Sequence, residues 1–178
     1  MVYRVSLRHK RNKLHQLSQV DSHNYRREEY TRSNIDPERT ESNRVLYRMY
    51  DDPTLSIKQM IERRIEELPQ KERPRIVEKG HNQTVVSVEL VLTASPEFFE
   101  DHPDKLDEWV ELNVQHIKEK YKDNLLDIVL HLDEKTPHFH INVMPLEKAE
   151  KNRRRTKKQI ANNESAGTYT VYNFNAKK

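Results

Sequence analysis

The side chains best suited to bind a metal ion are three histidines that lie close together in the sequence: His131, His138 and His140. They lie in a segment with the pattern of a β-hairpin. An apolar, β-branched run at 127–132 and an alternating run at 138–143 flank the polar, proline-containing residues 133–137. In an antiparallel ladder with His131 opposite His138, the imidazoles share one face and directly opposed Cβ atoms are about 5 Å apart. We therefore expect three ring nitrogens to converge on one cation.

Three imidazoles without a thiolate suit a borderline divalent ion such as Mn²⁺, Zn²⁺, Co²⁺ or Ni²⁺, whereas Mg²⁺ is less natural for nitrogen ligands. Three protein ligands leave coordination positions open, which is typical of a catalytic site. An open cation beside basic segments can polarise a phosphoryl oxygen. In the turn, Asp133 or Glu134 could orient an imidazole or accept a proton from a nucleophile. The alternatives are ordinary half-buried histidines and ordinary turn chemistry.

The hairpin needs a sheet and helices to hold it, and its own register indicates where they pack. It places Leu130 opposite Phe139 and Ile128 opposite Ile141 on an apolar face that other elements must cover. Alternation predicts further strands at 2–7, 45–50, 84–93 and 168–172. Apolar spacing predicts helices at 56–68 and 104–121, and parts of the polar stretch 10–32 are also expected to be helical. Because strands and helices mix without βαβ alternation, we expect an α+β fold, an antiparallel sheet with helices packed on it.

Composition narrows the class of protein. Hydrophobic and charged residues each make up 34% of the 178 residues, and no window resembles a membrane span or a signal peptide. There is no Cys, which excludes disulfides and fits a cytoplasmic protein, and only two Gly, which excludes glycine-rich nucleotide loops. Net charge is +5 over residues 1–50, −9 over 51–147 and +6 over 148–158, so a polyanion would meet the basic ends first.

The run His-Leu-Asp-Glu-Lys-Thr-Pro-His-Phe-His at 131–140 resembles the histidine-hydrophobic-histidine motif of HUH endonucleases. It is most similar to the H-x-D-E-x-T-P-H-x-H form of MobV-type plasmid relaxases, the plasmid mobilisation and recombination (Pre/Mob) family. The resemblance implies an HUH endonuclease-like fold and a metal-dependent enzyme that nicks and transfers single-stranded DNA at a plasmid transfer origin through a covalent 5′-phosphoryl intermediate. We expect Mn²⁺ as the cofactor, with Mg²⁺ or Zn²⁺ as alternatives. The expected partners are single-stranded or hairpin origin DNA and proteins of the conjugation machinery, with no membrane.

The resemblance also suggests the nucleophile. MobV-type relaxases have an N-terminal histidine, which matches His23 in His-Asn-Tyr-Arg, and attack by neutral imidazole would give a phosphoramidate. The alternative for His23 is an exposed histidine of a helix or loop. Tyr25 and Tyr30 are the nearby substitutes. Tyr169 or Tyr172 would be expected if the chain followed the motif order of rolling-circle replication initiators, in which the nucleophile follows the histidine motif.

Four more residues match positions that the resemblance assigns to active-site support or DNA contact: Arg26, Asn34, Arg39 and Asn43. An arginine there could clamp a phosphate through two hydrogen bonds. Glu134 joins His23 as a predicted catalytic residue.

The resemblance covers most of residues 1–145, so we expect a relaxase domain at 1–146. Residues 147–178 would be a basic extension and the start of a further, truncated segment. Two other functions remain open: a replication initiator nuclease, and a non-catalytic domain that binds origin DNA.

Overall fold

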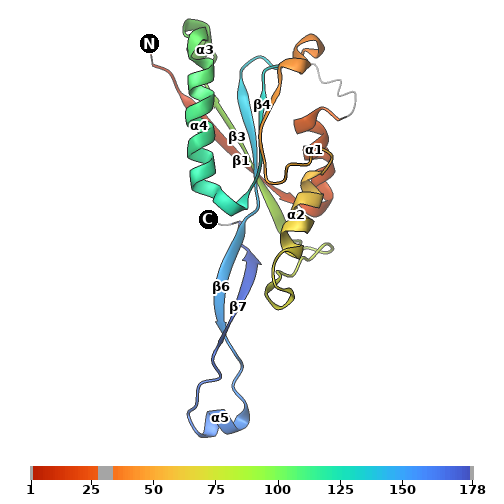
Figure 1. The fold of residues 1–178 in the computed structure, drawn as a ribbon, viewed down its shortest axis with the longest axis vertical. Helices are drawn as coiled ribbons and strands as arrows, with labels where there is room; N and C mark the ends of the chain where they lie inside the picture. The colour runs from red at the N-terminus through yellow and green to blue at the C-terminus, as the bar shows by residue number, and fades with distance from the viewer. Residues whose placement is uncertain (1, 28–33, 177–178) are drawn as a thin grey trace.

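The computed structural model describes residues 2–27 and 34–176 (Figure 1). Within these residues the body is a five-stranded antiparallel sheet with the order β1-β3-β5-β4-β2, and a second sheet pairs β6 with β7. The strands are β1 (Val5–Lys13), β2 (Arg44–Arg48), β3 (Val85–Ala94), β4 (Leu125–His131), β5 (His138–Val143), β6 (Leu146–Asn152) and β7 (Thr168–Phe174).

Helices cover both faces of the main sheet, with α4 on one side and α1 and α2 on the other (Figure 1). The α-helices are α1 (Leu17–Tyr25), α2 (Ile57–Glu66), α3 (Pro96–Asp101), α4 (Leu106–Tyr121) and α5 (Lys157–Ala161). Short 3₁₀ helices are η1 (Leu14–Gln16), η2 (Pro37–Ser42), η3 (Gln70–Glu72), η4 (Pro103–Lys105) and η5 (Lys122–Asn124). The predicted antiparallel α+β architecture is confirmed.

The central hairpin has the predicted register. β4 and β5 pair His131 with His138, Leu130 with Phe139 and Ile128 with Ile141. The apolar members of these pairs are buried in one core cluster with α4, and the single tryptophan, Trp109 of α4, stacks on Phe139 with ring centroids 4.7 Å apart. Because strand side chains alternate, the histidines lie on the opposite face, toward α1.

A second core cluster lies beneath α1 and α2. Its buried members include Leu17 and Val20 of α1 and Met60 of α2, packed against residues of β3 and β4 such as Leu126. This cluster fixes the position of α1 on the histidine face of the sheet, and α1 carries His23 in its last turn. The core therefore sets the distance between His23 and the hairpin.

Two segments differ from the predicted elements. β1 runs to Lys13, so the expected strand at 2–7 is displaced toward the C-terminus. In the stretch 10–32 the 3₁₀ helix η1 begins at Leu14 and α1 at Leu17. The long β3 offers a partner for this polar segment, with Arg11 opposite Val88, and such pairing overrides local preference. The segment after Pro145, where a basic extension was expected, forms β6 because β7 pairs with it over seven positions.

β6 and β7 form an arm that projects away from the main body, with α5 at its tip (Figure 1). At the base of the arm, Leu146, Tyr172 and Phe174 pack against the cluster beneath α1 and α2. The division into 1–146 and 147–178 stays a prediction. Within residues 2–27 and 34–176, none of the helices combines the length and the apolar character that a membrane crossing requires.

Candidate functional site

The three predicted metal ligands form one group, called here the histidine cluster: His131 at the end of β4, and His138 and His140 on β5. Ring centroids are 5.3 Å apart for His131–His138, 4.6 Å for His131–His140 and 5.0 Å for His138–His140. The antiparallel register brings the first two rings together, and the two-residue repeat of β5 adds the third.

One nitrogen of each cluster ring is held by a hydrogen-bond acceptor. The acceptors are the backbone oxygen of Asn24 at 3.0 Å for His131 Nε2, the backbone oxygen of Thr136 at 2.8 Å for His138 Nδ1, and a carboxylate oxygen of Glu89 at 2.8 Å for His140 Nδ1. A neutral ring that donates its N–H in this way keeps a lone pair on its other nitrogen. Metal-binding histidines are oriented by such contacts. Ligand atoms of His131, Glu134 and His138 lie within 4.8 Å of one another, and so do those of His23, His131 and His140, so the donors around the cluster fit a divalent cation.

Burial keeps the His138 and His140 rings in the form that can bind a metal. It lowers the pKa of His140 to about 4, although the neighbouring Glu89 carboxylate opposes this change. Burial also lowers the pKa of His138 below its usual value. Both rings are neutral at pH 7, and neutral imidazole is the form that ligates metals.

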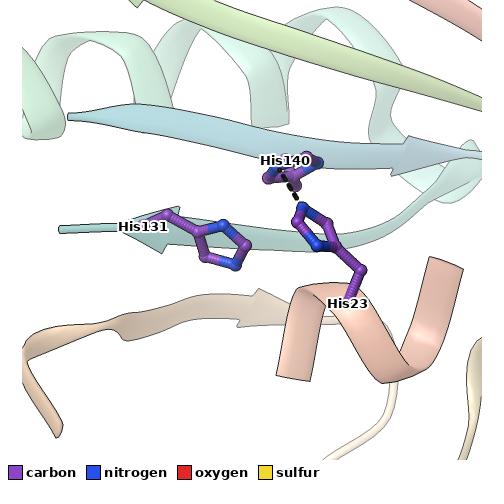
Figure 2. Close-up of side chains that lie close together, drawn as sticks. All are labelled: His23, His131 and His140. Carbon is purple, nitrogen blue, oxygen red and sulfur yellow. Dashed lines mark hydrogen bonds between the residues drawn. The ribbon is translucent and has the colours of Figure 1, made fainter. Parts of the chain in front are cut away.

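His23 projects from α1 toward the cluster, whose histidines lie on β4 and β5 (Figure 2). Its Nε2 is 3.3 Å from Nε2 of His140, and its ring centroid is 5.3 Å from that of His131. His23, His131 and His140 each offer one ring nitrogen, and these three nitrogens lie within 4.8 Å of one another. Burial, followed by the neighbouring His140 and His131, lowers the pKa of His23 to about 3. The side chain is a neutral imidazole next to the cluster.

Arg26 connects His23 to the hairpin turn. It ends α1 in the left-handed conformation, with φ of 49°, and its guanidinium makes two hydrogen bonds to Asp133, at 2.9 and 2.8 Å. Nη1 lies 3.1 Å from His23 Nδ1, and Nη2 lies 3.2 Å from His131 Nδ1. A cation bound at His131 Nδ1 would take over the lone pair that Arg26 now contacts.

Glu134 lies beside two of the cluster rings. Its Oε1 accepts from Arg26 at 3.0 Å and is 3.6 Å from His131 Nδ1 and 3.8 Å from His138 Nε2, while Oε2 accepts from Asn34 at 2.6 Å. Burial alone would raise the pKa of Glu134, but the contacts with His131, His138 and Arg26 outweigh it and lower this pKa strongly. The carboxylate is ionised, so it offers an oxygen to a cation but is a weak proton acceptor.

Arg39 and Asn43 hold the backbone of the turn. Arg39 donates to the backbone oxygens of Leu132 at 3.0 Å and Glu134 at 3.4 Å. The side-chain oxygen of Asn43 accepts from the backbone N–H groups of Leu132 at 2.7 Å and Asp133 at 3.2 Å. The structure thus brings the predicted DNA-binding residues to the hairpin turn, where their contacts lie within the protein. Their contact with DNA stays a prediction.

The tyrosines named as substitute nucleophiles lie in other environments. Tyr25 donates its hydroxyl to Asp127 at 2.8 Å, and burial, followed by the Asp127 charge, raises its pKa far above the usual value. Tyr169 and Tyr172 lie on β7, in the arm that follows the Val143 end of β5, whereas the cluster lies toward its His138 end. Tyr30 lies outside the described residues.

Sequence reasoning missed Glu89, the carboxylate that holds His140. Glu89 lies on β3, which pairs with β5 so that Val91 is opposite His140 and Glu89 is opposite Asn142. The signal that could have found it is an acidic residue on the polar face of the most regular predicted strand. That signal becomes useful only once the partner strand and register are known.

Comparison with known proteins identifies the family of the chain. A family model described as plasmid recombination enzyme (Mob_Pre) matches residues 1–176. A plasmid recombination enzyme of Bacillus sp is 32% identical over 137 residues, which is 75% of this chain and 31% of the relative. A type 2 plasmid recombination enzyme of Staphylococcus aureus is 32% identical over 133 residues, 73% of this chain and 30% of the relative. The chain spans about a third of the length of these curated relatives.

Solved structures of the MobM relaxase domain (MOBV; Mob_Pre), bound to plasmid pMV158 oriT DNA and to Mn, share the fold. One, at pH 6.8, has a TM-score of 0.66 and 25% identity and covers 86% of this chain and 74% of that one. Another, at pH 6.5, has a TM-score of 0.64 and 26% identity and covers 80% of this chain and 69% of that one.

The antiparallel sheet with its histidine-bearing hairpin is thus an α+β fold of the HUH relaxase type. The chain belongs to the plasmid recombination enzyme (Mob_Pre) family. The resemblance to MobV-type relaxases expected from the histidine motif is confirmed.

Proposed function

We propose that the chain is the nicking and strand-transfer domain of a plasmid mobilisation relaxase, acting on single-stranded DNA at an origin of transfer. The observation that carries this proposal is the neutral imidazole of His23, whose Nε2 lies 3.3 Å from His140 in a three-histidine cluster. Further support comes from family membership and from the oriT DNA bound to the MobM relaxase domain. Hairpin origin DNA and conjugation proteins are proposed partners.

The histidine cluster would hold the metal ion through His131 Nδ1, His138 Nε2 and His140 Nε2, the ring nitrogens opposite those held by Asn24, Thr136 and Glu89. Arg26, which contacts His131 Nδ1, and His23, which contacts His140 Nε2, would give way to the ion. We propose Mn²⁺, the ion named for the related MobM structures, with Mg²⁺ and Zn²⁺ as alternatives. A bound divalent ion supplies Lewis acidity to a phosphoryl oxygen. Glu134 would add a negative oxygen beside two of the ligand rings.

His23 would act as the nucleophile. A lone pair of its imidazole forms an N–P bond to the scissile phosphate as the P–O3′ bond breaks, and the electron pair of that bond leaves with the 3′ oxygen. The 3′ oxygen takes up a proton and becomes a hydroxyl, and the imidazole releases its remaining N–H proton. The product is a phosphoramidate between His23 and the 5′ phosphate, and attack by a 3′-hydroxyl on this bond reverses the step and joins strands.

Arg26 constrains which ring nitrogen of His23 attacks. A guanidinium has donors only, so its contact with Nδ1 uses the lone pair of that nitrogen and places the proton on Nε2. Attack through Nδ1 therefore requires Arg26 to move onto the phosphate, a group that it can clamp with two hydrogen bonds. Attack through Nε2 requires a change of tautomer. The low proton affinity of Glu134 favours a role in holding Arg26 over a role as general base.

The test is to incubate the protein with Mn²⁺ and a supercoiled plasmid that carries its own transfer origin, and to map the covalent adduct by mass spectrometry. We expect a nucleotide on His23 and none in a His23→Ala protein. His15→Ala, which changes an exposed histidine of η1, is the matched control and should nick normally. An adduct on Tyr169 or Tyr172 would indicate a replication initiator instead. Origin binding without cleavage would indicate a non-catalytic domain.

A further inference from the structure

The arm carries a concentration of positive charge that the histidine site does not use. Residues 148–158 contain seven Lys or Arg and one Glu. The cationic side chains among them are exposed, and within residues 2–27 and 34–176 none of the seven forms an ion pair with a carboxylate. Clustered like charges repel one another, so a polyanion would be bound favourably here.

The tip of the arm has a defined structure. Arg153 donates its backbone N–H to Gly167 at 2.9 Å, and its guanidinium lies 5.8 Å from the ring centroid of Tyr169. Thr156 accepts from the backbone N–H of Gln159 and caps α5. A hollow of about 600 Å³ opens at the tip, lined by Arg153, Arg154 and Arg155 together with Ile160 of α5 and the loop that precedes β7. The arginines are therefore displayed on an ordered framework.

The shape of the arm matches duplex DNA better than a single strand. The major groove of B-DNA is about 12 Å wide and admits a two-stranded β-ribbon. Strands of seven residues span about 24 Å, or about two-thirds of one helical turn of DNA. Aromatic platforms bind single strands, yet only Tyr169 is a substantially exposed aromatic residue on the described arm, at 40% exposure.

We propose that the arm binds the double-stranded part of the origin DNA, with Arg154 and Arg155 contacting phosphates across a groove. This inference rests on the proposed function: the single strand would reach His23, and the arm would be a second surface that binds the duplex next to that strand. The arm follows the Val143 end of β5, and the histidine cluster lies toward its His138 end. Duplex and scissile phosphate would accordingly be held at opposite ends of the sheet.

The test compares two labelled oligonucleotides of equal length by fluorescence anisotropy over a range of salt concentrations. One has a stem of about ten base pairs, one helical turn, followed by a single-stranded tail, and the other is unstructured. The variant is Arg154→Ala combined with Arg155→Ala, because both side chains are exposed and, among the described residues, neither makes a hydrogen bond or an ion pair. The control is Lys118→Ala combined with Lys120→Ala, which makes the same charge change on exposed positions of α4, across the sheet from the cluster.

We expect the arm variant to lose about tenfold in affinity for the stem-bearing oligonucleotide, with the slope of log affinity against log salt reduced by about 2. Its affinity for the unstructured oligonucleotide, and its His23 adduct, should match the control. If the arm variant lost the same affinity for both oligonucleotides, or lost none for either, the inference about the arm would be overturned. The proposed function would still stand in that case, provided the His23 adduct forms. Conversely, if the arm variant lost affinity only for the stem-bearing oligonucleotide and the parent protein formed no adduct, duplex binding by the arm would be supported and the proposed nuclease function contradicted.

Discussion

Replacing Arg26 separates two physical effects at one position, a buried ion pair and a strained backbone. Its guanidinium binds Asp133, whose side chain is fully buried, while its own side chain is only 9% exposed. The same residue has φ of 49°, a conformation that glycine adopts without the steric cost that other residues bear. Alanine and glycine at this position both remove the ion pair, but only glycine relieves the backbone.

The expected magnitudes follow from these contacts. Removing one partner of a buried ion pair costs about 3–5 kcal/mol, because the other charge stays buried. Asp133 keeps the hydroxyl of Thr40 at 3.2 Å, so the lower end of that range applies, and Arg26→Ala should cost about 3 kcal/mol. Relief of the left-handed conformation is worth about 1 kcal/mol, so Arg26→Gly should cost about 2 kcal/mol. Adding Asp133→Asn to Arg26→Ala removes the unpaired charge and should restore part of the loss.

The assay is urea unfolding at pH 7, followed through the fluorescence of the single tryptophan, Trp109, which stacks on Phe139 in the core. The predicted order of stability is the parent protein, Arg26→Gly, then Arg26→Ala. A glycine variant less stable than the alanine variant would refute the strain argument. A cost below about 1 kcal/mol for Arg26→Ala would refute the claim that the ion pair is effectively buried, since that is the range of exposed pairs.

Three further outcomes follow from the buried polar contacts. Burial raises the pKa of Asp127 from 3.8 to about 6. The folded state therefore loses up to about 3 kcal/mol of stability as pH rises from 4 to 6, because the unfolded chain gives up this proton more easily. In urea unfolding, Asp127→Asn should gain stability relative to the parent protein over that pH interval. Glu89→Gln removes the charged acceptor of His140 and should weaken Mn²⁺ binding about tenfold in calorimetric titration, with unchanged circular dichroism. Tyr25→Phe removes a buried hydroxyl and should cost about 1–3 kcal/mol in unfolding but leave DNA adduct formation intact, whereas loss of the adduct in a folded protein would implicate Tyr25.

The central hairpin was predictable because its sequence constrains it twice. The alternation at 138–143 determines which side chains share a face, and the turn at 133–137 fixes the register that pairs His131 with His138. Local pattern alone therefore places three imidazoles together. His23 could be connected with them only through the family motif, because nothing local indicates that α1 packs beside β5.

The remaining features depend on contacts between distant segments. β6 has a polar, charged sequence with two Lys and two Glu that does not indicate a strand, and it becomes one because β7 returns to pair with it. Arg39 and Asn43 were assigned to active-site support or DNA contact, and their hydrogen bonds to the backbone of the hairpin turn appear only in the folded chain. Glu89 gained its role from the pairing of β3 with β5. Register and long-range pairing determine all of these, and no short window of sequence contains that information.

The central claim is that the histidine cluster binds one divalent ion through the ring nitrogens opposite those held by Asn24, Thr136 and Glu89. The direct measurement is a crystal structure of the protein with Mn²⁺, with diffraction data collected at the manganese absorption edge. One anomalous peak at bonding distance from His131 Nδ1, His138 Nε2 and His140 Nε2, with Arg26 displaced from His131, is the predicted result. A peak elsewhere, or none at saturating Mn²⁺, would contradict the metal site and the nuclease mechanism built on it.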